Sequence, residues 1–209
     1  MTATAVDRLR TSTRAWHDAL ETTAFATAML AGTLPLDRYV AQLAAYRTVL
    51  EALEGELSRA THPAPASVWS PTLAKLSLVD SDLRYFAGRG SAPKPWGTDE
   101  AEAFAQEIRH TAAANPQALL GFLYVLEGST LGALILRRHV TTAYGLRDTD
   151  GVAYYCSGDR DRWARFTACM NAALADPEAQ SRAIAAAGRA YHHTEAIARA
   201  LSEGLAPGA

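Results

Sequence analysis

The chain has 209 residues, a length that suits a single hydrophobic core, and we expect one domain over residues 1–209. Hydrophobic residues make up 49% of it and charged residues 20%, a balance that excludes an intrinsically disordered protein. The net charge is −2, so no broad positive field favours nucleic acid or a membrane surface, and the absence of an apolar signal-peptide core at the N-terminus indicates a cytoplasmic protein.

Helical signals recur from the N-terminus onward, whereas the alternating pattern of a strand is hard to find. Asp7 is a suitable N-cap for a first helix that ends near Thr23. Pro35 fits the first turn of a second, long helix, which the prolines within residues 62–65 bring to an end. A third helix is expected to begin near Pro71.

The second half of the chain contains further helices, separated by a loop-like segment over residues 145–158. Their N-cap candidates are, in chain order, Thr98 or Asp99, Asn115, Ser157 or Asp159, and Asp176. About seven helices and no convincing strand predict an all-α, single-domain multi-helix bundle.

The most apolar of these helices, over residues 118–139, carries Gly121, Gly128 and Gly132 in its interior. Each glycine costs about 1 kcal/mol relative to alanine, so their presence needs a physical reason. Their spacing returns them to nearly one side of the helix, with Val125 between them, which leaves a stripe of bare backbone. Either a second helix or a flat ligand can approach such a stripe closely.

The polar neighbours of these glycines are compatible with both alternatives. Glu127, Ser129 and Thr130 would supply polarity in the otherwise apolar wall of a ligand site. Glycine, serine and threonine together can also kink a helix, which would open space above a ligand. Small residues at this spacing are equally typical of tight helix packing, so the stripe alone does not decide between the two.

Among the six histidines, His17 is the best candidate for a ligand. It shares a helix with Trp16 and Phe25 in an apolar setting, and Glu21 follows it one turn later on the same face. A carboxylate at that spacing can orient an imidazole through one ring nitrogen and leave the other free for a metal. The Glu-x-x-His motif of di-metal bundles occurs once, at residues 107–110, where such a site requires two. One axial histidine and a bare stripe fit a flat, metal-centred macrocycle held between two helices.

Two stretches resemble the biliverdin-producing haem oxygenases, in particular the bacterial branch that is often found with bacteriophytochromes. They are T-R-A-W-H-D-A-L-E-x-x-x-F at residues 13–25 and L-Y-V-L-E-G-S-T-L-G-A at residues 123–133. The resemblance implies a mostly helical domain in which haem lies between a proximal and a distal helix.

The resemblance also assigns roles to individual residues. His17 would be the proximal ligand of the haem iron, and Glu21 would orient its ring. The catalytic positions on the distal helix would be Gly128, Ser129 and Gly132, with Ser129 standing where mammalian members place an aspartate that organises distal water. The other haem-binding candidates are Phe25 at the proximal edge, Tyr124 and Val125 beside the distal glycines, and, for the haem propionates, Arg162 and Arg165 or alternatively Arg10 and Arg14.

The reaction that the resemblance implies is the cleavage of haem, which serves as both cofactor and substrate, to biliverdin, carbon monoxide and ferrous iron. It would consume oxygen and electrons from an external electron donor, such as ferredoxin or a flavoprotein reductase, and a bacteriophytochrome could accept the bilin. Two other hypotheses stay open: a non-catalytic haem or bilin carrier on the same scaffold, and a helical protein in which the glycine stripe serves packing alone.

Overall fold

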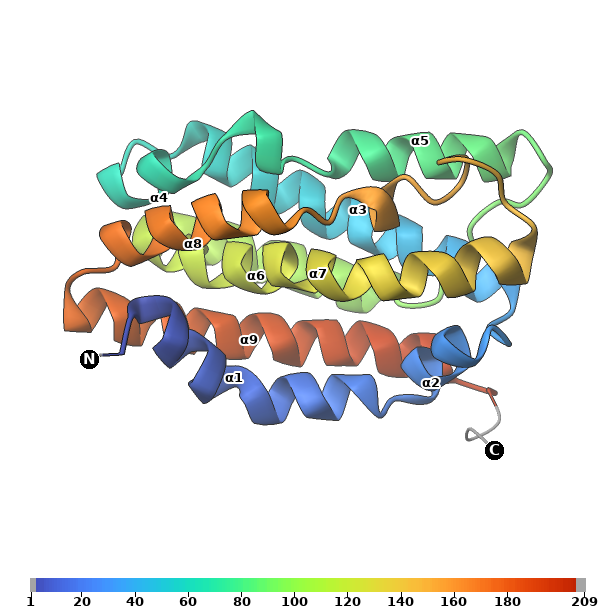
Figure 1. Cartoon of the computed structure of the whole chain (residues 1–209), viewed down its shortest axis with the longest axis horizontal. Coiled ribbons are helices and arrows are strands. Elements are labelled where there is room, and N and C mark those ends of the chain that lie inside the picture. Colours follow the sequence, from blue (N-terminus) through green and yellow to red (C-terminus); the bar gives the residue numbers. More distant parts are fainter. Residues whose placement is uncertain (1–2, 206–209) are drawn as a thin grey trace.

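A computed structural model describes residues 3–205 and confirms the all-α prediction, since these residues contain helices and turns but no strand (Figure 1). The α-helices are α1 (Ala5–Glu21), α2 (Ala24–Ala31), α3 (Leu36–Arg59), α4 (Pro63–Val68), α5 (Leu76–Ala87), α6 (Thr98–Ala114), α7 (Leu119–Tyr144), α8 (Arg160–Ala173) and α9 (Pro177–Ser202), with short 3₁₀ turns η1 (Pro71–Leu73), η2 (Pro116–Ala118) and η3 (Tyr154–Cys156). Residues 1–2 and 206–209 of the expected domain lie outside the described residues.

Side-chain caps mark five of the nine α-helix starts within residues 3–205. The expected caps at Thr98 or Asp99 and at Asn115 are wrong, because Gly97 is the N-cap of α6 and the Asn115 side chain makes no capping hydrogen bond.

Asp159 and Asp176 cap α8 and α9 by accepting hydrogen bonds from backbone N–H groups of the first turn. The expected cap at Asp7 is wrong, because Thr4 is the N-cap of α1. Asp7 is its partner in a capping box: each side chain accepts a hydrogen bond from the other residue's backbone N–H.

Two local predictions differ from the structure because threonine and proline start helices as readily as they end them. The chain leaves α1 at Glu21 and begins α2 after Thr23, whose hydroxyl accepts the N–H of Ala26 at 3.2 Å. Phe25 therefore lies on α2 and not on the helix of His17. Residues 63–68, expected to be a loop, form α4, because Pro63 occupies the first helical position, where no N–H is needed.

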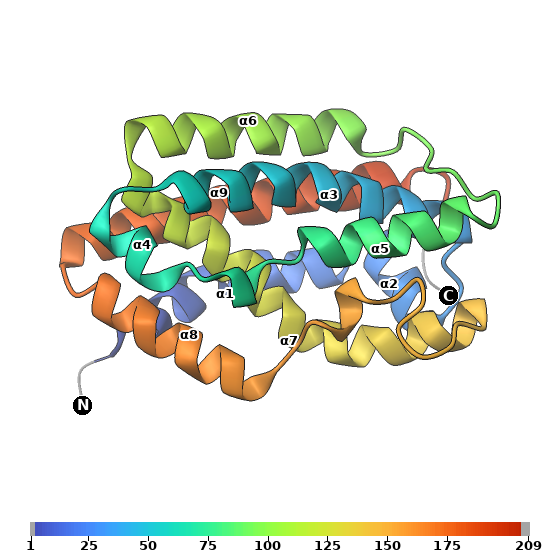
Figure 2. The same ribbon diagram turned by 90° about the horizontal axis from the view of Figure 1, so that it is seen from above.

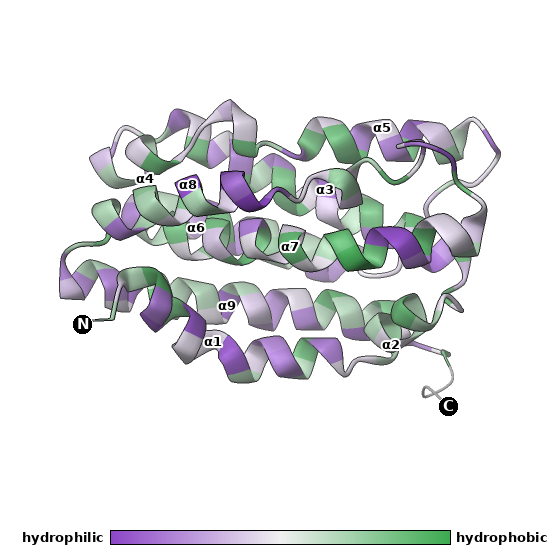
Figure 3. Ribbon diagram, viewed as in Figure 1, coloured by the Kyte–Doolittle hydropathy of each residue, from purple (hydrophilic) through white to green (hydrophobic). Residues whose placement is uncertain are grey.

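The long helix α7 crosses the middle of the bundle and contacts α9, α3, α8 and η3 (Figure 1). The segment Pro116–Tyr144 is apolar and long enough to span a membrane by those two criteria, yet 61% of its most apolar window is buried inside the protein. It is the core helix of the bundle. On the outer helix α1, by contrast, hydrophilic and hydrophobic residues alternate in the way expected of a helix with one buried face (Figure 3).

Helix α7 changes direction partway along its length (Figure 2). Two hydroxyls near its middle bond to backbone carbonyls one turn back: Ser129 Oγ donates to Leu126 O at 3.0 Å, and Thr130 Oγ1 donates to Glu127 O at 2.7 Å. Such bonds draw carbonyls away from the helical ladder, and together with the adjacent Gly128 they account for the bend.

Candidate functional site

A cavity of about 580 Å³ lies between α1 and α2 on one side and the middle of α7 on the other. Residues of α3, η3, α8 and α9 complete its walls. The volume is in the range of sites that enclose most of a small organic ligand. Both segments that the sequence singled out, around His17 and around Gly128, contribute to its lining.

The three glycines of α7 do not share one role. The sequence left two alternatives open, close helix packing and close approach of a flat ligand, and each applies to a different glycine. A Cβ on Gly121 would clash with the backbone of Ala183 and Ala187 on α9, so this glycine permits close helix packing. A Cβ on Gly132 would meet no heavy atom within 4 Å, and Gly132 lines the cavity. Gly128 also lines it, with the Trp163 ring 3.5 Å from the position of an added Cβ. Tight packing therefore explains the first glycine, and an open ligand space surrounds the third.

His17 lines the cavity from the opposite side, on α1. Its side chain is 52% exposed, so the apolar setting expected from the sequence is wrong: the ring lies at the mouth of the cavity rather than in the core. Tyr191 of α9 approaches it edge-on, with ring centroids 6.2 Å apart. The ring is thus supported on one side and accessible from the cavity.

Carboxylates flank both nitrogens of this imidazole. Glu21 Oε1 lies 3.7 Å from Nε2, and Asp18 Oδ1 lies 3.8 Å from Nδ1. Both distances exceed that of a hydrogen bond, so the expected orienting bond from Glu21 is not formed in this conformation. The three side chains are nevertheless the one group of histidine, cysteine or acidic residues in the described part of the chain whose ligand atoms lie close enough to share a metal ion.

The aromatic and apolar candidates lie along the wall of the cavity. Phe25, Tyr124 and Val125 are all buried and all line the cavity. Trp163 of α8 completes this wall, with its ring centroid 6.0 Å from that of Tyr124. The sequence indicated only that Trp163 belongs to a helix, and no local pattern distinguished it from a core tryptophan.

A polar wall that the sequence analysis missed faces the cavity beside Ser129. Tyr155 donates a hydrogen bond from its hydroxyl to Gln42 Oε1 at 2.7 Å, and Tyr154 and Tyr46 line the same region. Burial raises the pKa of Tyr154 and of Tyr155 well above the ordinary tyrosine value, so both hydroxyls stay protonated at neutral pH. The cavity therefore has protonated tyrosine hydroxyls along one wall.

Asp82 of α5 holds this polar wall in place. Its fully buried carboxylate accepts the backbone N–H groups of Ala153 and Tyr154 at 2.7 and 2.9 Å. Burial raises the pKa of Asp82 to about 6, and the two N–H bonds partly oppose that increase. The turn that presents the two tyrosines to the cavity thus depends on one buried carboxylate.

The expected propionate-binding arginines on α8 lie elsewhere. Arg162 Nε is 2.9 Å from Glu127 Oε1, and neither Arg162 nor the exposed Arg165 lines the cavity. The alternatives on α1, Arg10 and Arg14, do line it, and their side chains are 76% and 82% exposed. The cationic groups able to meet an anionic edge of a ligand are therefore those of α1, one to two turns before His17.

The three polar residues expected in the wall of the ligand site do not all face the cavity. Of Glu127, Ser129 and Thr130, only Ser129 lines the cavity. Glu127 is fully buried behind the wall and pairs with Lys75 and Arg162, and Thr130 is buried with its hydroxyl bonded to a backbone carbonyl. Residues adjacent in sequence point in different directions from a helix, so proximity to Gly128 did not place them in the site.

The residues present suit a flat, largely apolar molecule with a central metal and an anionic edge. Apolar and aromatic side chains supply the walls, and His17 offers an imidazole on one side. Gly132 leaves the backbone of α7 open on the other side, where any larger side chain would enter the cavity. Arg10 and Arg14 supply positive charge at the exposed rim. This combination matches haem, and His17 would hold the iron through a ring nitrogen.

Comparison with known proteins points to the same ligand class. The chain matches the heme oxygenase family over residues 3–200. It is 27% identical over 157 residues to "Heme oxygenase 1" of Nostoc sp., covering 74% of this chain and 66% of that protein. It is 24% identical over 178 residues to "Heme oxygenase 1" of Synechocystis sp., covering 84% and 74%.

Solved structures share the fold. Heme oxygenase-2 from Synechocystis sp. PCC 6803, in complex with heme and NO, superposes with a TM-score of 0.85 at 22% identity, covering 95% of this chain and 85% of that one. The heme oxygenase of Leptospira interrogans gives 0.84 at 22% identity, covering 94% and 99%. These likenesses establish the helical architecture. Because the family match spans nearly the whole sequence, including the cavity-lining segments of α1 and α7, the chain belongs to the heme oxygenase family.

Proposed function

We propose that this protein is a haem oxygenase, which binds haem as cofactor and substrate and cleaves it to biliverdin, carbon monoxide and ferrous iron. The observation that carries this proposal is the single cavity onto which both the His17 imidazole and the open backbone at Gly132 face. Haem, when bound, supplies the oxygen chemistry and the ring that is cleaved. The protein supplies binding, orientation and protons.

The α1 side of the cavity would hold and orient the ligand. His17 would bind the iron through one ring nitrogen. The carboxylate beside the other nitrogen, Asp18 at Nδ1 or Glu21 at Nε2, is near enough to orient the imidazole after a small side-chain adjustment. Arg10 and Arg14 pair with the propionates at the rim, where guanidinium groups can bind carboxylates through two hydrogen bonds. Phe25 provides an apolar contact at the same side.

The α7 side would control approach and proton supply. Gly128 and Gly132 lack side chains, so a planar ring and a small molecule beside it can come close to the backbone. Ser129 donates its proton to Leu126 O and keeps its lone pairs available to accept a hydrogen bond from water. The Tyr154 hydroxyl, which stays protonated, can donate a hydrogen bond to water in the cavity, whereas the Tyr155 hydroxyl is engaged by Gln42. No side chain in the cavity needs to act as a strong base.

The remaining parts of the proposal concern the setting of the reaction. The electrons come from an external donor such as a ferredoxin or a flavoprotein reductase, and a bacteriophytochrome accepts the bilin. The protein acts in the cytoplasm as one haem oxygenase-like domain over residues 1–209. Family membership supports the need for an external electron donor, and purified components can test these statements.

The test is an anaerobic haem titration followed by addition of reductant and oxygen, observed by visible absorption. We expect a Soret shift on binding and then the absorption of a bilin. His17→Ala should lose the axial-ligand spectrum of the wild type, and an unchanged spectrum would exclude His17 as the ligand. Stable haem binding without bilin, with several competent donors, would instead indicate a carrier. No Soret shift in the wild type would leave only the helical scaffold.

A further inference from the structure

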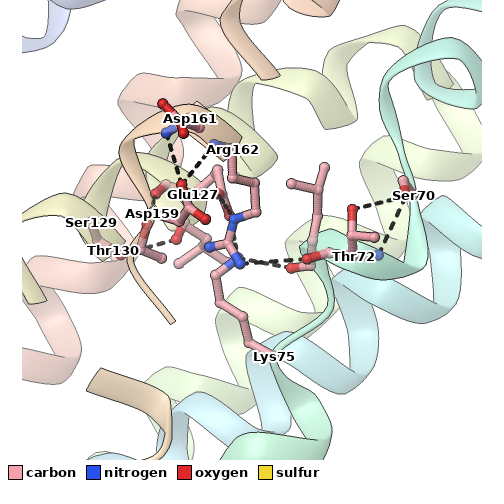
Figure 4. A network of polar contacts seen from close by, with 11 residues as sticks. Ser70, Thr72, Lys75, Glu127, Ser129, Thr130, Asp159, Asp161 and Arg162 are labelled. Carbon is pink, nitrogen blue, oxygen red and sulfur yellow. Dashed lines mark hydrogen bonds and ion pairs between the residues drawn. The ribbon is translucent and has the colours of Figure 1, made fainter. Parts of the chain in front are cut away.

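Three charged side chains form a buried network directly behind the α7 wall of the cavity (Figure 4). Glu127 is fully buried, and Lys75, which lies between η1 and α5, is 2% exposed. Lys75 Nζ lies 2.5 Å from one carboxylate oxygen of Glu127, and Arg162 Nε lies 2.9 Å from the other. Both oxygens of one carboxylate are therefore engaged by cations from different parts of the chain.

Further bonds extend the network, although Arg162 Nη2 is buried without a hydrogen-bond partner among the described residues. Lys75 Nζ also donates to Leu73 O at 2.9 Å, and Arg162 Nη1 donates to Thr72 O at 3.4 Å. Glu54 of α3 accepts the backbone N–H groups of Lys75 and Leu76 at 2.6 and 3.0 Å. Two carboxylates thus balance two cations. Charged groups are rarely buried unless they are paired in this way, because the free energy of removing a charge from water exceeds the stabilisation from a single ion contact.

The sequence neighbours of the network connect it to the cavity. Glu127 directly precedes Gly128, and Arg162 directly precedes Trp163. The Glu127–Arg162 ion pair therefore joins the sequence neighbours of two residues that line the cavity. A step of about 100° per residue directs Glu127 away from the cavity while Gly128 faces it. The Trp163 ring lies at van der Waals distance from the Gly128 position and lines the cavity. The Glu127–Arg162 contact therefore links α7 and α8 directly beside Trp163 and Gly128.

We propose that Lys75, Glu127 and Arg162 are positioning residues that hold α8 against α7 and so set the place of Trp163 over Gly128 in the haem cavity. The proposal rests on the proposed function for its consequence in turnover, but not for its structural content. None of the three side chains lines the cavity, so they act through Trp163 and Gly128 and not by contact with haem. Trp163 in turn limits where a planar ligand lies against the α7 backbone.

Arg162→Gln is the primary test, because it removes the outermost member and leaves the Lys75–Glu127 pair intact. The matched control is Arg160→Gln, the same change at an exposed position two residues earlier on α8. Glu127→Gln serves as a second variant, and Arg162→Lys, which keeps the charge but not the forked geometry, should restore part of the wild-type behaviour.

The first readout needs no haem. In apo-protein labelled with 5-fluorotryptophan, the Trp163 resonance is assigned by its loss in Trp163→Phe. We expect Arg162→Gln to shift or broaden this resonance and to leave that of Trp96, which lies beside Arg38, unchanged. Arg160→Gln should change neither. An unmoved Trp163 resonance in folded Arg162→Gln would overturn the proposal, as would the same shift in Arg160→Gln.

The second readout separates positioning from general stability. Small misplacements of a reaction site reduce rates by up to about 100-fold, so we expect turnover in Arg162→Gln to fall about 10- to 100-fold with the haem dissociation constant changed less than about threefold. The pattern of bilin isomers should also broaden. Equal losses in binding and turnover would contradict a positioning role. If the wild type binds haem but forms no bilin, the proposed function fails, and the fluorine resonance alone decides the role of the network.

Discussion

Gly121 and Gly132 lie about three turns apart on α7, and a single added methyl group should affect them in opposite ways. In Gly121→Ala the new Cβ would come within 3 Å of the Ala183 carbonyl oxygen, the Ala187 amide nitrogen and the Ala186 side chain. Two of these atoms belong to the α9 backbone and can move only with the helix. In Gly132→Ala the Cβ enters open space.

The expected magnitudes follow from two opposing effects. Alanine is favoured over glycine in a helix interior by about 1 kcal/mol, a gain that applies at both positions. At Gly121 the added Cβ meets backbone atoms of α9, so the overpacking costs about 2–3 kcal/mol, the upper part of the usual range, and the net change is a loss of about 1–2 kcal/mol. At Gly132 the gain is unopposed. The two variants should differ by about 2–3 kcal/mol in the free energy of unfolding of the apo-protein.

Urea unfolding of the apo-proteins, followed by circular dichroism at 222 nm, measures this difference. For a chain of this size 1 kcal/mol corresponds to about 2–4 °C in melting temperature, so thermal scans provide a second measurement. We expect Gly121→Ala to unfold at lower urea than the wild type and Gly132→Ala at equal or higher urea. Equal effects of the same sign would refute the assignment of Gly121 to helix packing and Gly132 to the cavity.

Two further predictions concern charge. Arg10→Gln combined with Arg14→Gln should weaken haem binding by roughly 10-fold, because pairing with the propionates is lost. The stability of the apo-protein should not fall, because both side chains are largely exposed. A titration with a haem whose propionates are esterified should show no difference in affinity between the variant and the wild type. Asp82 has a pKa of about 6 against an ordinary value of 3.8, so between these values the folded state binds more protons than the unfolded state, and stability falls as pH rises through this window. Asp82→Asn should remove up to about 3 kcal/mol of that decline, measured as the difference in unfolding free energy between about pH 4 and pH 7, and an unchanged pH dependence would show that Asp82 titrates normally.

Much of the fold could be predicted because its signals are local. The caps at Asp159 and Asp176 depend on hydrogen bonds within one turn, and the structure confirms both. The same locality explains the failures at Thr23 and Pro63, where residues that end one helix also start the next. Whether the chain continues after such a residue depends on which buried face the next turn presents, and that is not a local property.

The site was predictable only in part for the same reason. Seven of the predicted site residues line one cavity, and their roles toward haem stay predictions: His17, Phe25, Tyr124, Val125, Gly128, Ser129 and Gly132. The prediction for Arg162 as a propionate partner was wrong, because its partner is Glu127, 35 residues earlier in the chain. A basic residue near an aromatic one looks the same in a sequence whether its guanidinium meets a ligand or a buried carboxylate.

The all-α class and most helix boundaries could be predicted from the sequence, because hydrogen bonds within a turn and apolar periodicity specify these features. The pairing of His17 with the glycine-rich helix was a hypothesis supported by the resemblance to a known family. The packing of distant helices places α9 over Gly121, leaves the backbone at Gly132 open, and brings Lys75 and Arg162 together on Glu127. These outcomes depend on how helices far apart in the chain pack against one another, and the same glycine or arginine serves either purpose until that packing is known.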